Sequence, residues 1–450
     1  MKVNLKKLAD KLPEFDFVNL KDVNITGVSY DSRTIDKGDI FFPLKGDNFD
    51  GHDFIPNAFD GGAVVCMCDS EHFEHYNDRS EPIIVVNNIE EGLEKIVNVL
   101  FSDILTLRVG ITGSTGKTTT RQMLVKILKD YGTVLSSDRN FNTLWGNAKL
   151  LSEYDGEDYI VMEIAMDMPG EIAWQCRALE PDLGAILNIG YVHSEKLGGI
   201  KEVYESKKDL ADYLHRTGKP LVLNVDDEWL QKIPKNFTSK LITYGRKGND
   251  FKLLSTDISI DGTFIKFEHE GKKYETSIKA HGTDLSYNML AAMALAELLG
   301  VSVEDSVKSI KGYGGYLGRF YLHKINDELT IVNDAYNANP TSMKMAINTF
   351  DEIFDKSYER IVILGDMKEL GDVTKREHRK LGELVESKHF DYVYYLGDYY
   401  TDFGVGEELI NIEQAELILA RLKNSKRKKV AVLLKASHSI GLYDIVNFIT

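Results

Sequence analysis

Continuous apolar runs alternate with amphipathic segments through the middle of the chain. The apolar runs lie at residues 107–112, 159–166, 184–190 and 221–225. Residues 117–131, between the first two runs, repeat apolar side chains at helical spacing. Strands that are apolar on both faces and are separated by helices are typical of a parallel sheet covered on both sides. This pattern predicts a central parallel sheet.

Two changes of pattern follow. Residues 257–280 alternate around the turn pairs Asp261-Gly262 and Glu270-Gly271, which predicts an antiparallel edge to the same sheet before a helix at 286–299. After a glycine-rich segment at 312–315, the runs LTIVN, IVILGD, DYVYYLGD and VAVLLKAS recur with helical segments between them. That pattern predicts a second doubly wound, Rossmann-like sheet.

The first part of the chain has shorter apolar runs, at 39–44, 63–67 and 82–86, separated by turns. It predicts a small α/β domain. The sequence therefore predicts an α/β protein of three domains: residues 1–101, a central domain at 102–312 and a C-terminal domain at 313–450.

Composition narrows the class of protein. The 450 residues include 54 Lys and Arg and 70 Asp and Glu, which gives a formal charge of −16. This charge argues against a broad surface that binds nucleic acid or anionic lipid. The three cysteines fit neither a disulfide framework nor a metal-binding spacing. The sequence shows no signal-peptide core and no run of about 18 apolar residues, so we expect a cytoplasmic protein without a membrane span.

A phosphate-binding loop is predicted between the first apolar run of the central domain and the helix after it. The segment GITGSTGKTTT offers glycine backbone N–H groups, an ammonium and a hydroxyl to a nucleotide. Ile111 replaces the first glycine of the strict pattern, so the loop is a shorter variant, and the absence of an Asn-Lys-x-Asp tetrapeptide favours ATP. The alternative is a glycine-rich connecting turn. The candidate ATP-binding residues here are Gly113, Ser114, Thr115, Gly116, Lys117, Thr118 and Thr119.

Polar side chains near the following strand ends are candidate metal ligands. Glu163 interrupts an apolar strand, where a carboxylate needs a cation or a partner, so we interpret it as a Mg²⁺ ligand. The alternative is a backbone cap or an arginine pair. His193 and Glu195 follow the next strand in NIGYVHSEKLGG, although a loop histidine is often simply solvated.

Longer motifs resemble the Mur ligases. They are GSTGKTT, MEIAMDMPGEI, NIGYVHSE, GRF, NDAYNANPTSM and ILGDMKELG, together with YDSRTIDKGDIFFPLKGDNFDGHDF in the first domain, so the resemblance covers essentially the whole chain. It implies an ATP-dependent amide ligase of the cytoplasmic stage of peptidoglycan synthesis. The implied reaction adds D-Ala-D-Ala to UDP-N-acetylmuramoyl-tripeptide through an acyl phosphate, releasing ADP and phosphate. Residues 1–101 would then bind the uridine nucleotide.

The resemblance also implies roles for individual residues. Lys117 would hold the β- and γ-phosphates, Thr118 and Glu163 one Mg²⁺, and His193 a second Mg²⁺. Lys207 in YESKKDL fits the spacing of a lysine carbamylated by CO₂ better than Lys208 does; the alternative is a solvated helix lysine. Lys117, Glu163, His193 and Lys207 are thus the candidate catalytic residues.

Further contacts are implied for the substrates. Asn288 and Asn337 match the adenine side of the ATP site, and Arg319 and Asp334 lie near its phosphates and ribose. The muramoyl peptide would meet Asn140, Asn142 and Thr143, and the uridine diphosphate Ser32, Arg33, Lys45 and Gly46. For Asn337 and Asn339 the alternative is a turn before Pro340, and for Arg33 a surface ion pair.

Some positions depart from the family pattern, and other functions stay open. Asp284-Leu285 replaces His-Asn before the adenine helix, Ala165 and Asp167 differ in the strand motif, and His438 replaces arginine. The main alternative is a Mur-type ligase for a different amino acid or dipeptide. A folate-type ligase is disfavoured because such ligases lack the first domain. A nucleotide-gated binding module is disfavoured because Glu163 and His193 would have no role in it. A kinase would differ in forming its product without an amine acceptor. We expect a monomer.

Overall fold

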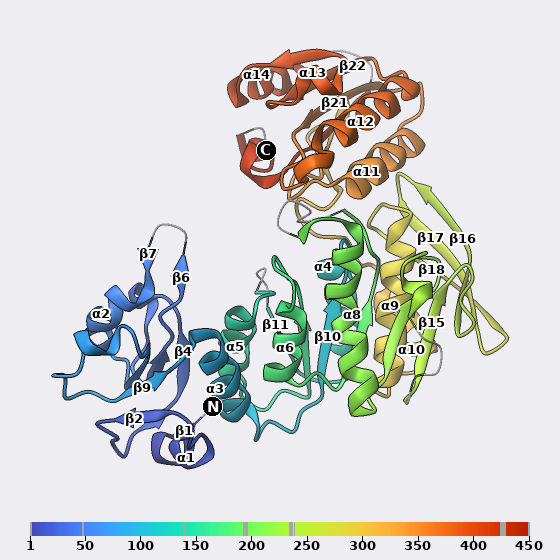
Figure 1. Cartoon of the computed structure of the whole chain (residues 1–450). Coiled ribbons are helices and arrows are strands. Elements are labelled where there is room, and N and C mark those ends of the chain that lie inside the picture. The colour runs from blue at the N-terminus through green and yellow to red at the C-terminus, as the bar shows by residue number, and fades with distance from the viewer. Residues whose placement is uncertain are drawn as a thin grey trace.

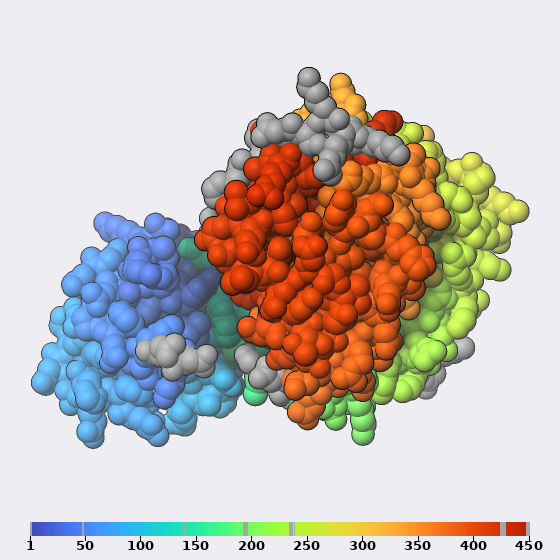
Figure 2. Space-filling view, turned by 90° about the horizontal axis from the view of Figure 1, so that it is seen from above, coloured from blue at the N-terminus to red at the C-terminus, as the bar shows by residue number. Residues whose placement is uncertain are grey.

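The computed structural model describes residues 2–46, 49–137, 141–191, 197–233, 237, 239–423 and 429–448. The chain forms three α/β bodies, each built around its own main sheet (Figure 1). In the view from above, the C-terminal body lies over the central one, and the N-terminal body stands to the side (Figure 2). Among the described helices, none is both long and apolar enough to cross a bilayer.

The N-terminal body has a five-stranded sheet in the order β2-β9-β8-β5-β4. All neighbouring strands are parallel except β2 against β9. The carboxyl ends of β4, β5 and β8 therefore meet at one edge, where the β6–β7 hairpin also lies. Its elements are β1 (Val3–Asn4), α1 (Leu5–Lys11), β2 (Asp16–Val18), β3 (Asn24–Ile25), β4 (Gly27–Ser29), β5 (Asp39–Phe41), β6 (Lys45–Gly46), β7 (Phe49–Asp50), α2 (Ile55–Gly61), β8 (Val65–Asp69), β9 (Ile83–Val86) and α3 (Ile89–Phe101).

The central body has a nine-stranded sheet in the order β11-β12-β10-β13-β14-β15-β16-β17-β18. It is parallel as far as β16 and antiparallel from β16 to β18, which confirms the predicted parallel sheet and its antiparallel edge. The strands are β10 (Arg108–Thr112), β11 (Val134–Ser136), β12 (Tyr159–Glu163), β13 (Leu183–Ile186), β14 (Leu221–Asn224), β15 (Leu241–Gly245), β16 (Phe251–Ser259), β17 (Gly262–His269) and β18 (Lys272–Ile278).

Helix α9 (Asp284–Leu298) is the most deeply buried helix of this body. Residues 289–296 are 0% exposed because α9 packs between the sheet, α4 and α10. Alanines at four of these positions let α4 and the strands approach closely, while the methionines and leucines fill the remaining space. The other helices are α4 (Lys117–Leu128), α5 (Leu144–Ser152), α6 (Glu171–Leu179), α8 (Ile200–Thr217) and α10 (Val303–Ile310).

The C-terminal body has a six-stranded sheet in the order β19-β20-β24-β21-β22-β23, parallel except for β19. The four predicted strands are present, and β19 and β23 are additional short edge strands. Separate hydrophobic clusters cover the two faces, as expected for a doubly wound sheet. The elements are β19 (Tyr321–Lys324), β20 (Leu329–Asn333), α11 (Pro340–Ile353), β21 (Glu359–Gly365), α12 (Thr374–Lys388), β22 (Tyr392–Leu396), α13 (Tyr400–Phe403), β23 (Glu407–Leu409), α14 (Ile412–Lys423) and β24 (Val430–Lys435).

The two outer bodies join the central one differently. One hydrophobic cluster runs from the N-terminal body into α5, α6 and β12. In the described residues, the clusters of the C-terminal body draw on the central body only through Ile258. The N-terminal body is therefore packed firmly onto the central one, whereas the C-terminal body has its own cores.

Arg108, the first residue of β10, ties the N-terminal body to the central sheet. Its side chain is 4% exposed and donates to three carbonyls: Leu179 O at 2.8 Å, Ile104 O at 3.2 Å and Phe101 O. Phe101 is the last residue of α3, and Ile104 lies in the segment between α3 and β10. Removal of the guanidinium would leave all three without this donor.

We expect Arg108→Met to lower the free energy of unfolding by about 3 kcal/mol, because buried carbonyls lose their hydrogen bonds. The measurement is calorimetric unfolding of both proteins. Lys95→Met is the matched control, since Lys95 is part-exposed and its ammonium contacts Glu14, Glu91 and the Phe15 ring without donating to a buried carbonyl. Equal losses in the two variants would contradict this role for Arg108.

Candidate active site

The predicted phosphate loop connects the carboxyl end of β10 to α4. Gly116 has a φ of +82°, and a Cβ there would lie 2.4 Å from Asn288 Oδ1 on α9. A Cβ on Gly113 would lie 2.9 Å from Cβ of Leu187. Both glycines are therefore required by close packing, and the first also by its backbone conformation.

Asn188, just after β13, holds the backbone of this loop. Its Oδ1 accepts from Thr115 N at 2.9 Å, its Nδ2 donates to Thr115 O at 3.1 Å, and its own carbonyl accepts from Ser114 N at 3.1 Å. The Ser114 hydroxyl in turn exchanges hydrogen bonds with Gly190. Sequence reasoning did not single out Asn188, although a polar residue directly after a buried strand was the available signal.

Lys117 begins α4, and its ammonium curls back over the loop. Lys117 Nζ donates to Gly113 O at 2.7 Å. Burial lowers the pKa of Lys117, while the nearby Glu163 carboxylate acts in the opposite direction. The ammonium lines a cavity of about 310 Å³ at the carboxyl edge of the central sheet.

Glu163 ends β12 beside β10 and is 4% exposed. Its Oε1 accepts from Arg121 Nε at 2.8 Å, so the arginine pair considered as an alternative is present. Its Oε2 accepts from Thr118 Oγ1 at 3.2 Å, which brings the two predicted Mg²⁺ ligands together. Sequence reasoning missed Arg121, whose signal was a charged residue one helical turn after Lys117.

Lys207, on α8, is 1% exposed, and its Nζ lies 3.3 Å from Met166 Sδ. Burial, with a smaller contribution from Lys117, lowers its pKa well below the usual value. Among the described side chains, no carboxylate lies within ion-pair distance of it. Lys208 instead forms an ion pair with Asp212 at the surface. The solvated-lysine alternative therefore applies to Lys208 and not to Lys207.

The C-terminal body contributes the opposite wall. The Arg319 guanidinium lies 4.3 Å from the centroid of the Tyr336 ring. Asp334 accepts from Phe320 N at 3.0 Å and pairs with Lys435 at 2.7 Å. Lys435 is 1% exposed and also donates to Asn337 O at 3.1 Å, so it fixes the loop after β20. Its role was not predicted.

The asparagines before α11 have local bonds of the kind expected for a turn. Asn337 Oδ1 accepts from Ala338 N at 2.8 Å. Asn339 caps α11 through a reciprocal pair of bonds with Ser342. Asn337 also lines the cavity that contains Lys117. Its local hydrogen bond is therefore compatible with a place in the candidate site.

Two adjoining cavities thus lie where the central and C-terminal bodies meet. The first is lined by Lys117, Glu163 and Arg319, with Asn142 and Thr143 from the start of α5. The second, of about 360 Å³, is lined by Asn288, Asp334 and Arg319. Asn140, His193 and Glu195, which the sequence also indicated, lie outside the described residues.

Asp284, at the first turn of α9, faces the second cavity. Burial, together with the Asp334 carboxylate, raises the pKa of Asp284 to about 7. The resemblance implies a histidine at this position, where this chain has a carboxyl group.

The predicted uridine-diphosphate residues lie on the N-terminal body, outside both cavities. Ser32 and Arg33 follow β4, and Lys45 and Gly46 follow β5 at the same sheet edge. The Arg33 guanidinium is 86% exposed and bonded twice to Asp31, at 2.9 and 2.7 Å, which is the surface ion pair considered as its alternative. The hairpin that carries Lys45 projects toward the side of the molecule where the C-terminal body lies (Figure 1).

Known proteins match this chain over nearly its full length. The Mur ligase family catalytic domain matches residues 24–101, the Mur ligase middle domain 111–296, and the glutamate ligase domain 318–438. The UDP-N-acetylmuramoyl-tripeptide–D-alanyl-D-alanine ligase of Bacillus subtilis is 30% identical over 94% of this chain and 92% of that protein. The Escherichia coli protein of the same name is 25% identical over 94% of each chain.

Solved structures agree. MurF from Thermotoga maritima in complex with ADP has a TM-score of 0.83 and 26% identity, covering 94% of this chain and 96% of that one. MurF from Acinetobacter baumannii, at 24% identity, shares the fold with a TM-score of 0.88 over 100% and 99% of the two chains. With three matching domains and a relative at 30% identity over nearly its whole length, this chain belongs to the Mur ligase family of ATP-dependent ligases.

Proposed function

We propose that this ligase joins D-alanyl-D-alanine to UDP-N-acetylmuramoyl-tripeptide in the cytoplasm, as a monomer, with ATP converted to ADP and phosphate. The relatives that match most of the chain carry this activity in their names. The observation that carries the proposal is the cavity in which Lys117 and Glu163 of the central body meet Arg319 and Asn337 of the C-terminal body. Such a site brings a nucleotide and an acceptor to one place.

The chemistry requires two transfers at one carboxyl group. The terminal carboxylate of the tripeptide takes the γ-phosphoryl group of ATP, and ADP leaves. The dipeptide amine then attacks the acyl carbon, loses a proton, and expels phosphate. Lys117 and Arg319 provide positive charge on two sides of the cavity, where it offsets the negative charge of the transferred group. Asn142 and Thr143, with Asn140, orient the peptide.

The donor set fits a magnesium ion. Thr118 Oγ1 and Glu163 Oε2 lie 3.2 Å apart beside the phosphate loop and would hold it, with His193 assigned to a second ion. Bound Mg²⁺ supplies charge neutralisation at the phosphates. Arg121 holds Oε1 of Glu163, so Oε2 can exchange the hydrogen bond that it accepts from Thr118 for the ion.

A carbamate on Lys207 would complete this set. The buried amine has no carboxylate partner among the described residues, and its neighbour Met166 offers only a weak acceptor. The neutral amine of Lys207 adds to CO₂ and releases one proton, which leaves a carbamate whose oxygens are anionic metal ligands. Burial that disfavours the ammonium favours this modification.

The uridine nucleotide is assigned to residues 1–101, with the central domain at 102–312 and the C-terminal domain at 313–450. Ser32 and Arg33 share a sheet edge with Lys45 and Gly46, which supports the assignment of all four to one diphosphate. Binding there would require Arg33 to exchange Asp31 for phosphate.

A ligase for a different amine acceptor is the second candidate. His438 lines a cavity of about 430 Å³ with Asn337 and Lys368, next to the first cavity. A histidine cannot form the two parallel hydrogen bonds that arginine makes to a carboxylate. The replacement of arginine by His438 would therefore fit an amine acceptor whose carboxylate is bound less specifically.

The deciding experiment measures phosphate release from ATP with UDP-muramoyl-tripeptide, with and without D-Ala-D-Ala, followed by mass analysis of the nucleotide product. Release that needs both substrates, with a product heavier by the dipeptide less water, supports the proposal. Release with another amine assigns the second candidate. A phosphorylated nucleotide product that forms without any amine acceptor and is seen in the mass analysis would indicate a kinase.

Lys117→Ala is expected to lower kcat/KM for ATP by at least about 100-fold, because the phosphates lose a charge placed at the loop. Steady-state phosphate release gives the value. Lys129→Ala, at the exposed C-terminal end of the same helix, should leave the rate unchanged. A normal rate in Lys117→Ala would exclude the phosphate-loop assignment.

Lys207→Ala should abolish ligation, and Lys208→Ala should not. Protein equilibrated with ¹³C-labelled bicarbonate should show one carbamate carbon resonance that is absent from Lys207→Ala and present in Lys208→Ala. An identical spectrum for the wild type and Lys207→Ala would rule out the modification at this residue.

The KM for ATP should rise between about pH 6 and pH 8, because Asp284 ionises there beside Asp334 and repels the anionic nucleotide. The folded protein keeps a proton that the unfolded chain releases above its usual pKa of 3.8, so this group costs stability as the pH rises toward 7. Asp284→Asn should flatten the KM profile and raise the unfolding temperature at pH 8 but not at pH 4. The same slope of KM in both proteins would contradict this assignment.

A further inference from the structure

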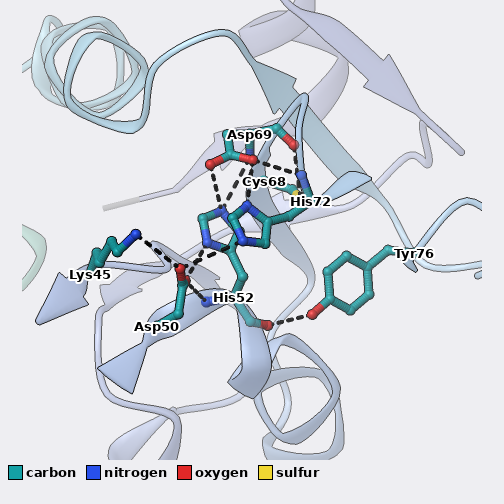
Figure 3. Close-up of polar contacts among 7 residues, drawn as sticks. All are labelled: Lys45, Asp50, His52, Cys68, Asp69, His72 and Tyr76. Carbon is teal, nitrogen blue, oxygen red and sulfur yellow. Dashed lines mark hydrogen bonds and ion pairs between the residues drawn. The ribbon is translucent and has the colours of Figure 1, made fainter. Parts of the chain in front are cut away.

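Two histidines and two aspartates converge on the N-terminal body, away from the ATP cavities. Asp50 ends β7, and His52 follows it in the short helix Gly51–Phe54. Asp69 ends β8, and His72 lies three residues later. Figure 3 shows the four side chains facing one another between the hairpin and the strand end.

The two imidazole rings stack with their centroids 4.0 Å apart and 5° between their planes. Each ring turns one nitrogen toward Asp50 and the other toward Asp69. His52 Nδ1 lies 2.6 Å and His72 Nε2 3.6 Å from Asp50 oxygens. On the other side, His72 Nδ1 lies 2.7 Å and His52 Nε2 3.6 Å from Asp69 oxygens. The cluster therefore has two faces, each with one carboxylate and two ring nitrogens.

We propose that Asp50, His52 and His72 bind one divalent transition-metal ion of the zinc class, and that Asp69 positions the histidines. The ligand atoms of the three residues all lie within 4.8 Å of one another. Two imidazoles and a carboxylate are ligands that suit zinc, cobalt and nickel better than magnesium or calcium.

Asp69 is placed to orient the two histidines through the ring nitrogens that face away from Asp50. Asp69 Oδ1 accepts from His72 Nδ1, which leaves the Nε2 lone pair directed toward Asp50. For His52 to bind an ion through Nδ1, its proton moves to Nε2. That nitrogen then gives up the hydrogen bond that it accepts from Asp69 N at 3.3 Å and donates to Asp69 Oδ2 instead. Two carboxylates and two neutral imidazoles then carry a charge of −2, which a divalent ion balances when it displaces the exposed Lys45 ammonium, whose Nζ lies 3.9 Å from Asp50 Oδ2.

The two histidines differ in how deeply they are buried. His52 is 3% exposed, and Tyr76 Oη donates to its carbonyl at 2.6 Å, so its ring is held in place. His72 is 35% exposed, so its ring has space on the solvent side to tilt out of the parallel stack toward the ion while Nδ1 stays bonded to Asp69. The ion would cross-link the hairpin that carries Lys45 to the chain after β8.

A second group of possible ligands, His269 with Glu270 and Glu297, is a weaker candidate among the described residues. It has one imidazole, whose Nδ1 lies 2.9 Å from Asp250 O and whose ring stacks on Phe251 at 4.3 Å. It can contribute only a single ring nitrogen, so it serves as the expected background in a metal titration.

The test is a titration of the full, tag-free chain with Co²⁺, followed by visible absorption, and with Zn²⁺, followed by calorimetry, without nucleotide or substrate. The wild type should bind one ion more than His72→Asn. His75→Asn is the matched control, because His75 is an exposed histidine three residues away that is outside the cluster. Zn²⁺ should raise the unfolding temperature of the wild type and His75→Asn but not of His72→Asn.

Asp69→Asn separates positioning from ligation. It should keep the number of bound ions and weaken their affinity by about 10- to 100-fold, as expected for a carboxylate that orients a metal-bound histidine. Equal stoichiometry and equal affinity in the wild type and His72→Asn would overturn the proposal. Because no substrate is present, this result is independent of the ligase assay.

Discussion

The contact between Gly116 and Asn288 is the constraint on which the ATP site depends. A side chain of any size at Gly116 would occupy the space of the Asn288 amide. The contact forms because α9 is buried on all sides and packs against α4 through small residues. The packing of the central core thereby sets the distance between the phosphate loop and Asn288. A change in the packing of the central core would therefore also change the geometry of the phosphate loop.

The sequence predicted the parts of the fold whose signal is local. The apolar strands β10, β12, β13 and β14, the hairpins at Asp261-Gly262 and Glu270-Gly271, and the phosphate loop each have a continuous pattern. The short edge strands β19 and β23 were not predicted, because three or four residues carry too little periodicity. The roles of Asn188, Arg121 and Lys435 depend on partners between 42 and 101 residues away in sequence, which a local pattern cannot reveal.

Two buried lysines differ in whether a carboxylate is available to stabilise the ammonium. Lys435 and Lys207 are each 1% exposed, and burial lowers the pKa of both. Lys435 is paired with Asp334 and bonded to two carbonyls, so it acts as a structural cation. Lys207 has only the Met166 sulfur among the described residues. A sequence pattern distinguishes neither case from a lysine on a surface helix.

The shared core between the N-terminal and central bodies has a consequence for substrate selection. Arg108 and this apolar cluster fix the sheet edge of Lys45 relative to the loop of Lys117. The C-terminal body, which has its own cores, is attached more loosely. A molecule anchored at the first edge reaches the second only if its length matches the fixed span. With the uridine nucleotide bound there, as proposed, the N-terminal body would select nucleotide-linked peptides by their length as well as by their chemistry.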